Sequence, residues 1–341
     1  MQQIFFPAEW HSQSGIQLTW PHIRTDWSDI LDEVVDCYIS ISREIIKREK
    51  LIIVVPDNSD VHQYFSDEEK KNIIFIEIES NDTWARDHGS ISVFIDNKPT
   101  LLDFGFNGWG LKFASNLDNQ INDRLYKMSV FNPEVEYKSY INFILEGGSI
   151  ETDGKGTLLT TTQCLLAPNR NQPLRKEQIE EHLKNVLGIN RVLWLNYGFL
   201  AGDDTDSHID TLARFCDEDT IAYVKCDDAS DIHYIELKQM EAELKSFVKS
   251  DGKPYKLLPL PMVDALYGNS GRLPATYANF LIINNAVLMP TYGTTKDEIA
   301  KELLQKQFPD REIVGIDCLP LIKQHGSLHC VTMQFPEGFI R

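Results

Sequence analysis

Cys330 is the residue of this sequence whose surroundings best suit a nucleophile. It follows the glycine-containing loop HGSLHC and opens an apolar stretch, and the imidazoles of His325 and His329 could hold its sulfur as the reactive thiolate. A buried structural thiol is the alternative. We expect that alternative for the remaining cysteines, which lie in apolar or periodic stretches and form no C-x-x-C pair: Cys37, Cys164, Cys216, Cys226 and Cys318.

A histidine and an aspartate stand two residues apart in the loop GDDTDSHID. If His208 and Asp210 begin a strand, their side chains lie on the same face of it. An imidazole beside a carboxylate suits proton transfer next to a bound cation. An ordinary hydrogen-bonded pair at the surface is the alternative.

Two more carboxylates lie in loops that follow apolar runs. Glu146 precedes Gly147 and Gly148, which let a ligand approach the backbone closely. Its carboxylate either orients an imidazole or caps the turn. Asp87 follows Arg86 in the loop NDTWARDHG, where it is either a site carboxylate or half of a surface ion pair.

Several of these side chains are also metal donors, but their spacing matches no known metal motif. The candidate ligand set is His208, Asp210, His325, His329 and Cys330, and the sequence contains no H-E-x-x-H. It also lacks the G-x-x-x-x-G-K-[ST] and G-x-G-x-x-G patterns of nucleotide sites and the G-x-S-x-G elbow of serine hydrolases. We therefore expect a site without metal.

The reactive loops recur in a regular order of predicted elements. An apolar, β-branched run leads into a polar loop, a hairpin follows, and a helix leads to the next unit. Five such units can be traced. Their apolar runs, loops or turns are Leu51–Val55 with a turn at Asp96-Asn97, EGGS with a turn at Asp153-Gly154, Arg191–Leu195 with a turn near Asp217–Asp219, Tyr255–Leu260 with a turn at Asn284-Asn285, and Glu312–Asp317 before the final strand Cys330–Phe335.

Helices are expected between these units. Ser28, Leu31, Val34, Val35 and Tyr38 have the cap and spacing of an amphipathic helix. The predicted helices are Ser28–Lys47, Asn119–Met128, Lys176–Leu187, Ser230–Val248 and Lys296–Gln305. Units of roughly 50–70 residues favour a radial α/β array, in which the polar loops converge at one end of the axis. An irregular α/β fold is the alternative, because the units share an order of elements and no sequence motif.

The chain is strongly acidic. It has 33 Lys and Arg against 51 Asp and Glu, a formal net charge of −18. Such a surface repels nucleic acid and anionic membranes and favours a cationic ligand, although acidity for solubility alone is the alternative. The N-terminal MQQIFFP resembles no secretory signal and no apolar run is long enough to span a membrane, so we expect a cytoplasmic protein.

Taken together, these segments resemble the agmatine deiminase and bacterial-type peptidylarginine deiminase family. The resemblance runs nearly end to end, and its strings follow the family order. They are TWARDHGSISVF, FNGWGLKF, EGGSIETDGKGTLLTTTQCLLAPNRN, GDDTDSHIDTLARF, GRLPATYANFLIINNAVLMPTYG and HGSLHCVTMQFP. The resemblance implies a five-bladed pseudo-symmetric α/β propeller, here as a single catalytic domain over residues 1–341.

The resemblance also implies the chemistry. Cys330 would be the nucleophile, His208 the general acid/base, Asp87 and Asp210 the carboxylates that hold a guanidinium, and Glu146 the support of the histidine. Agmatine would be hydrolysed to N-carbamoylputrescine and ammonia through a covalent thiouronium intermediate, without metal or organic cofactor. For the distal ammonium of agmatine the candidates are Asp204, Asp206, Trp84 and Trp109.

Two departures from the family pattern bear on the substrate. The chain has HGSLHC where many members have GGGNIHC, and Ser207 where glycine is frequent. Peptidylarginine or free arginine is therefore the alternative substrate, and a metal-dependent hydrolase and a non-catalytic propeller that binds partners are further alternatives. The expected partner is a small cationic guanidine, without nucleic acid or membrane, and formation of a homo-oligomer stays open.

Overall fold

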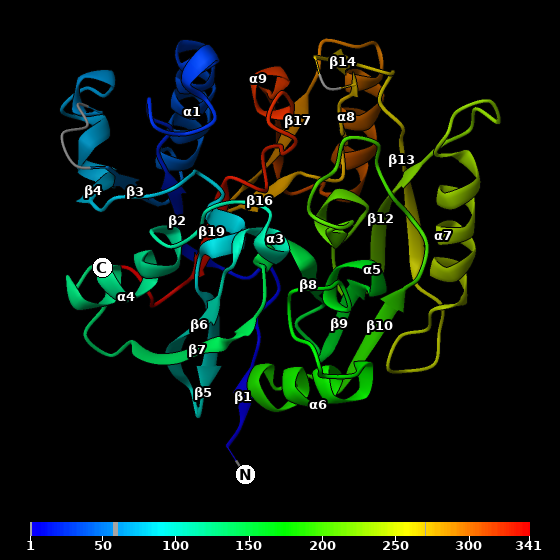
Figure 1. The fold of residues 1–341 in the computed structure, drawn as a ribbon, viewed down its shortest axis with the longest axis horizontal. Coiled ribbons are helices and arrows are strands. Elements are labelled where there is room, and N and C mark those ends of the chain that lie inside the picture. Colours follow the sequence, from blue (N-terminus) through cyan, green and yellow to red (C-terminus); the bar gives the residue numbers. More distant parts are fainter. Residues whose placement is uncertain (1, 57–60, 270) are drawn as a thin grey trace.

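The structure is a computed structural model that describes residues 2–56, 61–269 and 271–341. The chain has a mixed α/β fold made of several small sheets (Figure 1). Ser270, which falls in the predicted loop YGNSGRLPATYAN, lies outside the described residues. The outer elements in Figure 1 include the long helices, whereas the short helices α2 (Ala85–His88) and α3 (Gly108–Leu111) lie near the centre.

Within the described ranges, five sheets have three or four strands and one has two. The two-stranded sheet pairs β14 (Tyr267–Gly268) with β15 (Gly271–Arg272). In spatial order the larger sheets are β1 (Ile4–Phe5), β5 (Ile91–Ile95), β6 (Lys98–Gly105), β7 (Glu136–Ile144); β10 (Arg191–Leu195), β9 (Thr157–Thr161), β8 (Ile150–Thr152); β11 (Ala213–Phe215), β12 (Thr220–Lys225), β13 (Lys256–Pro261); β16 (Leu281–Ile283), β17 (Ala286–Thr291), β18 (Glu312–Asp317); and β19 (Thr332–Pro336), β2 (Gln13–Thr19), β3 (Lys50–Val55), β4 (Ile73–Glu77).

The larger sheets repeat one pairing pattern. The order of elements along the chain is as predicted, but the grouping into units is wrong, because the apolar run that was expected to open a unit pairs with the strands before it in the chain. An antiparallel pair is followed by a strand that joins it in parallel: β5–β6 then β7, β8–β9 then β10, β11–β12 then β13, and β16–β17 then β18. In the last sheet β19 pairs antiparallel with β2, and β3 joins β2 in parallel. That pairing joins the second strand of the chain to the last one.

The predicted hairpin turns are present where the sequence places residues that tolerate a positive φ. Asp96 and Asn97 join β5 to β6 with φ of 51° and 65°. Asn285 has a φ of 61° between β16 and β17. Asx side chains accept this backbone region more readily than other non-glycine residues, so these turns were visible in the sequence.

The long helices also lie close to their predicted ranges. In α1 (Leu31–Ile46), which follows the 3-10 turn Ser28–Ile30, the spacing of Val34, Tyr38, Ile41 and Ile45 gives one buried face. The other predicted helices are α4 (Ile121–Lys127), α6 (Lys176–Leu187), α7 (Tyr234–Ser246) and α8 (Lys296–Gln307). Two short helices complete the described set, α5 (Thr162–Leu165) and α9 (Leu319–Ile322).

Short irregular segments from different sheets meet at the centre. Helix α2 contacts the 3-10 turn η5 (Gly147–Ser149) and the strand β19, and η5 contacts the 3-10 turn η6 (Ile209–Thr211). These are the segments in which the sequence places Asp87, Asp210 and, just before β19, Cys330. The fold therefore brings together the chemistry that the sequence distributes over some 250 residues.

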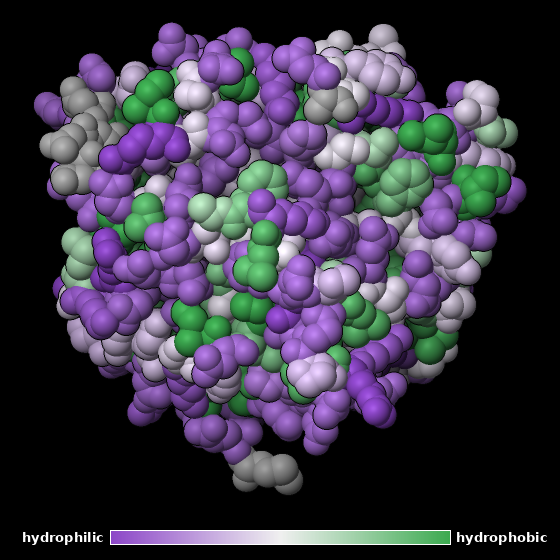
Figure 2. Space-filling view, in the orientation of Figure 1, coloured by the Kyte–Doolittle hydropathy of each residue, from purple (hydrophilic) through white to green (hydrophobic). Residues whose placement is uncertain are grey.

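The face of the molecule seen in Figure 2 is mostly hydrophilic, with hydrophobic residues scattered among the polar ones. In the part of the chain that the structure describes, no helix has both the length and the apolar character needed to cross a membrane.

Candidate active site

Cys330 is buried at the bottom of a pocket, two residues before β19. It is 8% exposed, and its Sγ lies 3.4 Å from Oδ1 of Asn279 and 3.9 Å from Oδ2 of Asp210. Burial, followed by the negative charges of Asp210 and Asp87, raises the pKa of the Cys330 thiol well above its usual range. Cys330 therefore carries its proton near neutral pH.

The expectation that His325 and His329 hold Cys330 as a thiolate is wrong. Nδ1 of His325 lies 2.6 Å from the carbonyl oxygen of Gly202, on another loop. The ring of His329 is held between two carboxylates, with Nδ1 2.7 Å from Asp210 and Nε2 2.7 Å from Glu9. Neither imidazole is hydrogen-bonded to the sulfur in this arrangement, and both serve other partners.

Asp87 lies in α2, which presents its carboxylate to two protein donors and an imidazole. Nε1 of Trp109 donates to Oδ2 at 2.9 Å, and the backbone N–H of Gly148 donates to Oδ1 at 3.1 Å. Nδ1 of His208 lies 3.5 Å from Oδ1. Burial raises the pKa of Asp87 to about 6, against the opposing positive charge of His208.

Asp210 lies beside Cys330, behind the described residues that line the pocket, and one of its oxygens has no partner. Its Oδ2 accepts from His329, whereas Oδ1 is buried and accepts no hydrogen bond from any described residue. Burial would raise the pKa of Asp210, but the hydrogen bond and charge of His329 and the charge of His208 outweigh it and lower the pKa. A buried, ionised carboxylate with a free oxygen is costly unless a cationic donor completes it.

The i, i+2 spacing of His208 and Asp210 predicted that both lie on one face of a strand, and this prediction is wrong. His208 precedes the 3-10 turn η6 and Asp210 lies within it, before β11 begins. The tighter turn directs both side chains at Gly148 of η5. A Cβ atom at Gly148 would lie 2.7 Å from Nδ1 of His208, 2.8 Å from Oδ1 of Asp87 and 3.2 Å from Oδ2 of Asp210, so glycine is required for this approach.

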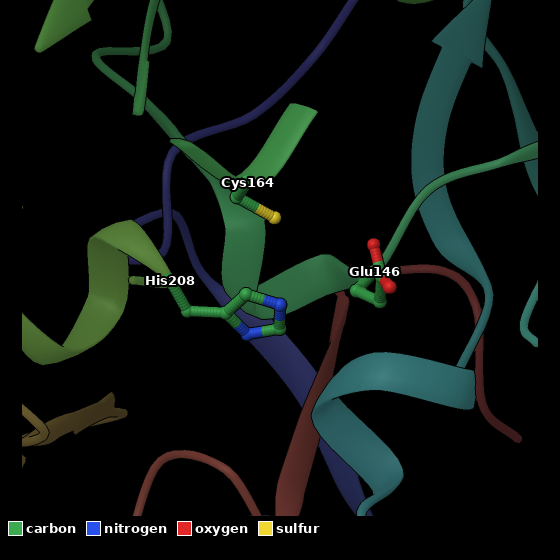
Figure 3. Close-up of side chains that lie close together, drawn as sticks. All are labelled: Glu146, Cys164 and His208. Carbon is green, nitrogen blue, oxygen red and sulfur yellow. The ribbon is translucent and has the colours of Figure 1, made fainter. Parts of the chain in front are cut away.

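Burial favours the neutral form of His208, but the negative charge of Asp87, followed by the contributions of Cys164 and Glu146, raises its pKa well above the usual range. The imidazole therefore holds its proton near neutral pH and can act as a general acid. Glu146 lies beside the imidazole of His208 (Figure 3). Its Oε1 accepts from Nε of Arg170 at 2.9 Å, whereas its buried Oε2 has no hydrogen-bond partner among the described residues.

The pocket above Cys330 encloses about 190 Å³ and is strongly acidic. Among its described lining residues there is no lysine or arginine. The lining consists of Asp26, Asp82, Trp84, Asp87, Trp109, Phe113, Asp203, Asp204, Thr205, His208, Thr211, Gln324, His325, Gly326 and Cys330. Burial, followed by the charge of Asp26, raises the pKa of Asp82 to about 7. Burial and the charge of Asp203 also raise the pKa of Asp204.

Of the four predicted substrate-binding residues, Trp84, Trp109 and Asp204 line this pocket, and Asp206 does not. Oδ1 of Asp206 pairs with Nζ of Lys112 at 2.9 Å, and Oδ2 pairs with Nη1 of Arg170 at 2.6 Å. Asp206 is therefore linked to Glu146 through Arg170, which pairs with both carboxylates. Asp206 and its neighbour Ser207 both have positive φ, 68° and 61°.

Trp109 enters the pocket because of an unusual backbone. The residues of α3 all have positive φ, 66° at Gly108, 54° at Trp109, 83° at Gly110 and 69° at Leu111. Left-handed conformations are costly for residues other than glycine, so a run of four is held by surrounding contacts. Asn107 provides two of them, accepting from the N–H of Gly110 and donating to the carbonyl of Asn169.

Sequence reasoning missed several residues of the site. Asn279 is fully buried and its Oδ1 accepts the backbone N–H of His329 at 2.9 Å and lies beside the Cys330 sulfur. Its signal was its place in a polar loop directly before a hairpin, the same place that Asp210 occupies. Glu9 had no signal, because its partner His329 is 320 residues away in the chain. Asp82 stood in the loop NDTWARDHG but was not singled out.

Two buried groups of described residues contain donors of the kind that metals use. They are Glu146, Cys164 and His208 (Figure 3), and Glu9, Glu151 and His329. In each group a buried arginine already pairs with a carboxylate, Arg170 with Glu146 and Arg214 with both Glu9 and Glu151. The negative charge that would attract a cation is therefore already compensated.

Comparison with known proteins shows which family the chain is similar to. The model of the Porphyromonas-type peptidyl-arginine deiminase family matches residues 5–336. A protein of Legionella pneumophila (strain Paris) that is provisionally named agmatine deiminase is 34% identical, over 98% of this chain and 96% of its own length.

Solved structures agree over the whole chain. A Porphyromonas gingivalis protein provisionally named arginine deiminase is 55% identical, with a TM-score of 0.96 over 99% of this chain and 100% of that one. A substrate-bound variant of C. jejuni agmatine deiminase is 40% identical, with a TM-score of 0.92 over 100% of this chain and 98% of that one.

Proposed function

Because the chain belongs to the Porphyromonas-type peptidyl-arginine deiminase family, we propose that it is an agmatine deiminase, a hydrolase that converts agmatine to N-carbamoylputrescine and ammonia. The observation that carries this proposal is the acid-lined pocket that ends at Cys330 and the unpartnered oxygen of Asp210. A guanidinium is a planar cation with N–H donors that match carboxylates in a bidentate fashion. Asp87 and Asp210 would hold it with its central carbon next to the sulfur.

Binding of the cation would activate the nucleophile. The charges of Asp210 and Asp87 raise the pKa of the Cys330 thiol, and a bound guanidinium compensates both of them. The thiol then loses its proton to solvent, and the thiolate attacks the guanidinium carbon to form a tetrahedral adduct. Protonated His208 gives its proton to one amino group, the C–N bond breaks, and ammonia leaves. A cationic thiouronium remains on Cys330.

Hydrolysis of this intermediate restores the enzyme. Neutral His208 takes a proton from water, and the oxygen attacks the thiouronium carbon. The resulting adduct loses its remaining hydroxyl proton to solvent as the C–S bond breaks, which releases the ureido product and the Cys330 thiolate. The overall reaction consumes one water and one guanidinium and yields one ureido group and one ammonium.

The pocket chemistry favours agmatine over arginine. Agmatine ends in an ammonium alone, whereas arginine carries an α-carboxylate in addition to its α-ammonium. Asp82 and Asp204 suit the ammonium, since a bound cation would lower their raised pKa values. Trp84 and Trp109 offer aromatic faces for cation–π contact. Free arginine is the second candidate, because the P. gingivalis relative is provisionally named for it and Lys112 donates to the backbone oxygen of Asp204 at 2.6 Å, near the pocket.

Ammonia release from agmatine, free arginine and a blocked arginine peptide, measured side by side, tests this choice. We expect kcat/KM for agmatine to exceed that for the other two by at least about 100-fold, since an α-carboxylate would be desolvated among aspartates in a pocket whose described lining has no lysine or arginine. Faster turnover of arginine would instead assign the enzyme to arginine, and turnover of the peptide alone would assign it to protein modification.

Asp204→Asn is expected to raise the KM for agmatine roughly tenfold while kcat stays within about twofold, because a charge-assisted contact to the distal ammonium is made in the ground state and the transition state alike. Steady-state kinetics with agmatine measure both constants. Asp206→Asn is the matched control, since Asp206 pairs with Lys112 and Arg170 outside the pocket lining. An unchanged KM in Asp204→Asn would remove Asp204 from the ammonium site.

The pH dependence should follow the carboxylates of the pocket. The pKa of Asp87 is raised to about 6 and that of Asp82 to about 7, so both lose their charge as pH falls through this range. We expect kcat/KM for agmatine to fall as pH is lowered from 8 to 5, reporting the free enzyme. The fall in kcat should occur at lower pH than the fall in kcat/KM, because the bound cation lowers the pKa values of both carboxyl groups. If kcat and kcat/KM fell over the same pH range, this assignment would be contradicted.

Further features of the proposal rest on the same family membership. We propose that the five larger sheets form the blades of a pseudo-symmetric α/β propeller and that residues 1–341 act as a single catalytic domain; the repeated hairpin-plus-parallel-strand pattern supports this. We also place the enzyme in the cytoplasm, with putrescine formation and polyamine synthesis as the pathway that its product suggests. The acidic composition supports a small cationic substrate rather than nucleic acid as the partner.

A further inference from the structure

The ring of His329 lies between two buried carboxylates, one of which belongs to the proposed site. His329 is 1% exposed, Asp210 is fully buried and Glu9 is 8% exposed. Nδ1 of the ring lies 2.7 Å from Oδ2 of Asp210, and Nε2 lies 2.7 Å from Oε2 of Glu9. An ionised carboxylate can only accept a hydrogen bond, so Nδ1 is the donor in the contact with Asp210. In the proposed reaction Asp210 holds the guanidinium, and this imidazole has no chemical step of its own.

The orientation of this ring is fixed by its surroundings. The backbone N–H of His329 donates to Oδ1 of Asn279 at 2.9 Å, which holds the main chain in place. Behind the ring, Oε1 of Glu9 accepts the N–H of Ile282 in β16 at 2.7 Å, and Oε2 pairs with Nη2 of Arg214 in β11 at 2.9 Å. A flip of the ring would break the contact of Nε2 with this anchored carboxylate, so Nδ1 stays directed towards the site.

The contact divides the two oxygens of Asp210 between the protein and a ligand. Oδ2 accepts from His329 and lies 3.9 Å from the sulfur of Cys330, whereas Oδ1 is buried and accepts no hydrogen bond from any described residue. Burial would raise the pKa of Asp210, and the hydrogen bond from His329 is the first of the contributions that instead lower it. Without this donor, both oxygens would lack a partner and the carboxylate could rotate away from the guanidinium.

We propose that His329 is a positioning residue for Asp210. Its Nδ1–H fixes one oxygen of the carboxylate, so that the other oxygen is left for an N–H of the guanidinium. This inference rests on the proposed deiminase function, in which Asp210 and Asp87 hold the guanidinium beside Cys330. Glu9 acts one step further back, by holding the ring in the orientation that serves Asp210.

Two amide substitutions separate the two contacts of the ring. The amide nitrogen of asparagine occupies the place of Nδ1 of histidine, so His329→Asn keeps a donor for Asp210. The amide nitrogen of glutamine occupies the place of Nε2, so His329→Gln keeps a donor for Glu9 alone. Both amides are neutral, so the two variants differ in the contact that they keep and not in charge.

We expect His329→Gln to lower kcat/KM for agmatine about 10–100-fold, which is the contribution of one hydrogen bond to a charged group. His329→Asn is the conservative variant and should stay within about fivefold of the wild type. Steady-state kinetics with agmatine measure both variants. Equal losses, or a larger loss in His329→Asn, would overturn the proposal, because the effect would then follow the contact with Glu9 or the packing of the ring. Unchanged kcat/KM in both variants would overturn it as well.

A second readout needs no turnover. In a Cys330→Ser background, isothermal titration calorimetry measures the affinity for methylguanidinium, a probe that carries the guanidinium group and no tail. We expect His329→Gln to raise its Kd roughly tenfold or more, and His329→Asn to leave it within about threefold. If the wild type releases no ammonia from agmatine, the proposed function fails, while the order of these Kd values still decides the role of His329. Equal or reversed Kd values would contradict that role, and an absence of binding to the Cys330→Ser parent would exclude the guanidinium site and this role together.

Discussion

Cys330→Ser is expected to lower kcat for ammonia release from agmatine on the order of 10⁴-fold or more, comparable to the loss of a nucleophile in other covalent hydrolases. A hydroxyl is far less acidic than a thiol, and the groups nearest the sulfur are an amide oxygen and a carboxylate, Asn279 and Asp210. Neither of them replaces the intrinsic reactivity of sulfur. A coupled ammonia assay at saturating agmatine measures the effect.

The control for this substitution is Cys226→Ser. The Cys226 thiol follows β12, away from the pocket lining, and donates to the backbone oxygen of Asp228 at 3.6 Å, a role that a hydroxyl can fill. Its kcat should stay near that of the wild type. If Cys330→Ser kept more than about a tenth of wild-type kcat, covalent catalysis at this residue would be excluded.

The state of the nucleophile gives a related expectation. Because burial and the nearby aspartates raise the pKa of the Cys330 thiol, its alkylation by iodoacetamide should be slow at neutral pH and should still accelerate above pH 9. An enzyme with a preformed thiolate would instead show a plateau near neutral pH.

Asp87→Asn is expected to lower kcat/KM for agmatine roughly 10³-fold. The substitution removes one of the two charges that hold the guanidinium, at about 1.5–3 kcal/mol for each charge-assisted hydrogen bond. Both carboxylate oxygens also accept from protein donors, Trp109 and Gly148, so the amide group of asparagine would face an N–H. Loss of the Asp87 charge also lowers the pKa of His208, so a smaller fraction of the imidazole holds the proton that it must donate.

Steady-state kinetics with agmatine measure this loss, and Asp123→Asn controls for net charge. Asp123 lies on α4 and pairs with Lys127 at the surface, 2.6 Å from its Nζ. Its kcat/KM should stay within about twofold of the wild type, as expected for a surface ion pair. A similar loss in both variants would show that overall charge, rather than the site, attracts the substrate.

Much of the fold followed from local patterns. The helix α6 (Lys176–Leu187) occupies its predicted range, because its apolar spacing and Gly188 at its C-cap are local signals. The turn at Asp96-Asn97 was equally visible. The pairing of β19 with β2 could not be predicted in this way, since it joins residues more than 300 positions apart and no local pattern encodes it.

The site was less predictable than the fold. The spacing of His208 and Asp210 suggested a strand, but the structure has a 3-10 turn there. The contacts of both side chains with Gly148 come from a distant segment and are not encoded in the local spacing. Asp206 was expected in the pocket together with Asp204, yet its ion pairs with Lys112 and Arg170 hold it outside the pocket lining. Cys164 was expected to be a buried thiol, and it is buried; its place beside His208 depends on contacts between separate sheets.

The most direct test of covalent catalysis at Cys330 is intact-protein and peptide mass spectrometry after rapid acid quenching of the enzyme with agmatine. We predict a transient adduct whose mass equals agmatine minus ammonia, located on the peptide that contains Cys330 and absent from Cys330→Ser. Ammonia release by the wild type without any such adduct, or an adduct on another residue, would contradict the mechanism.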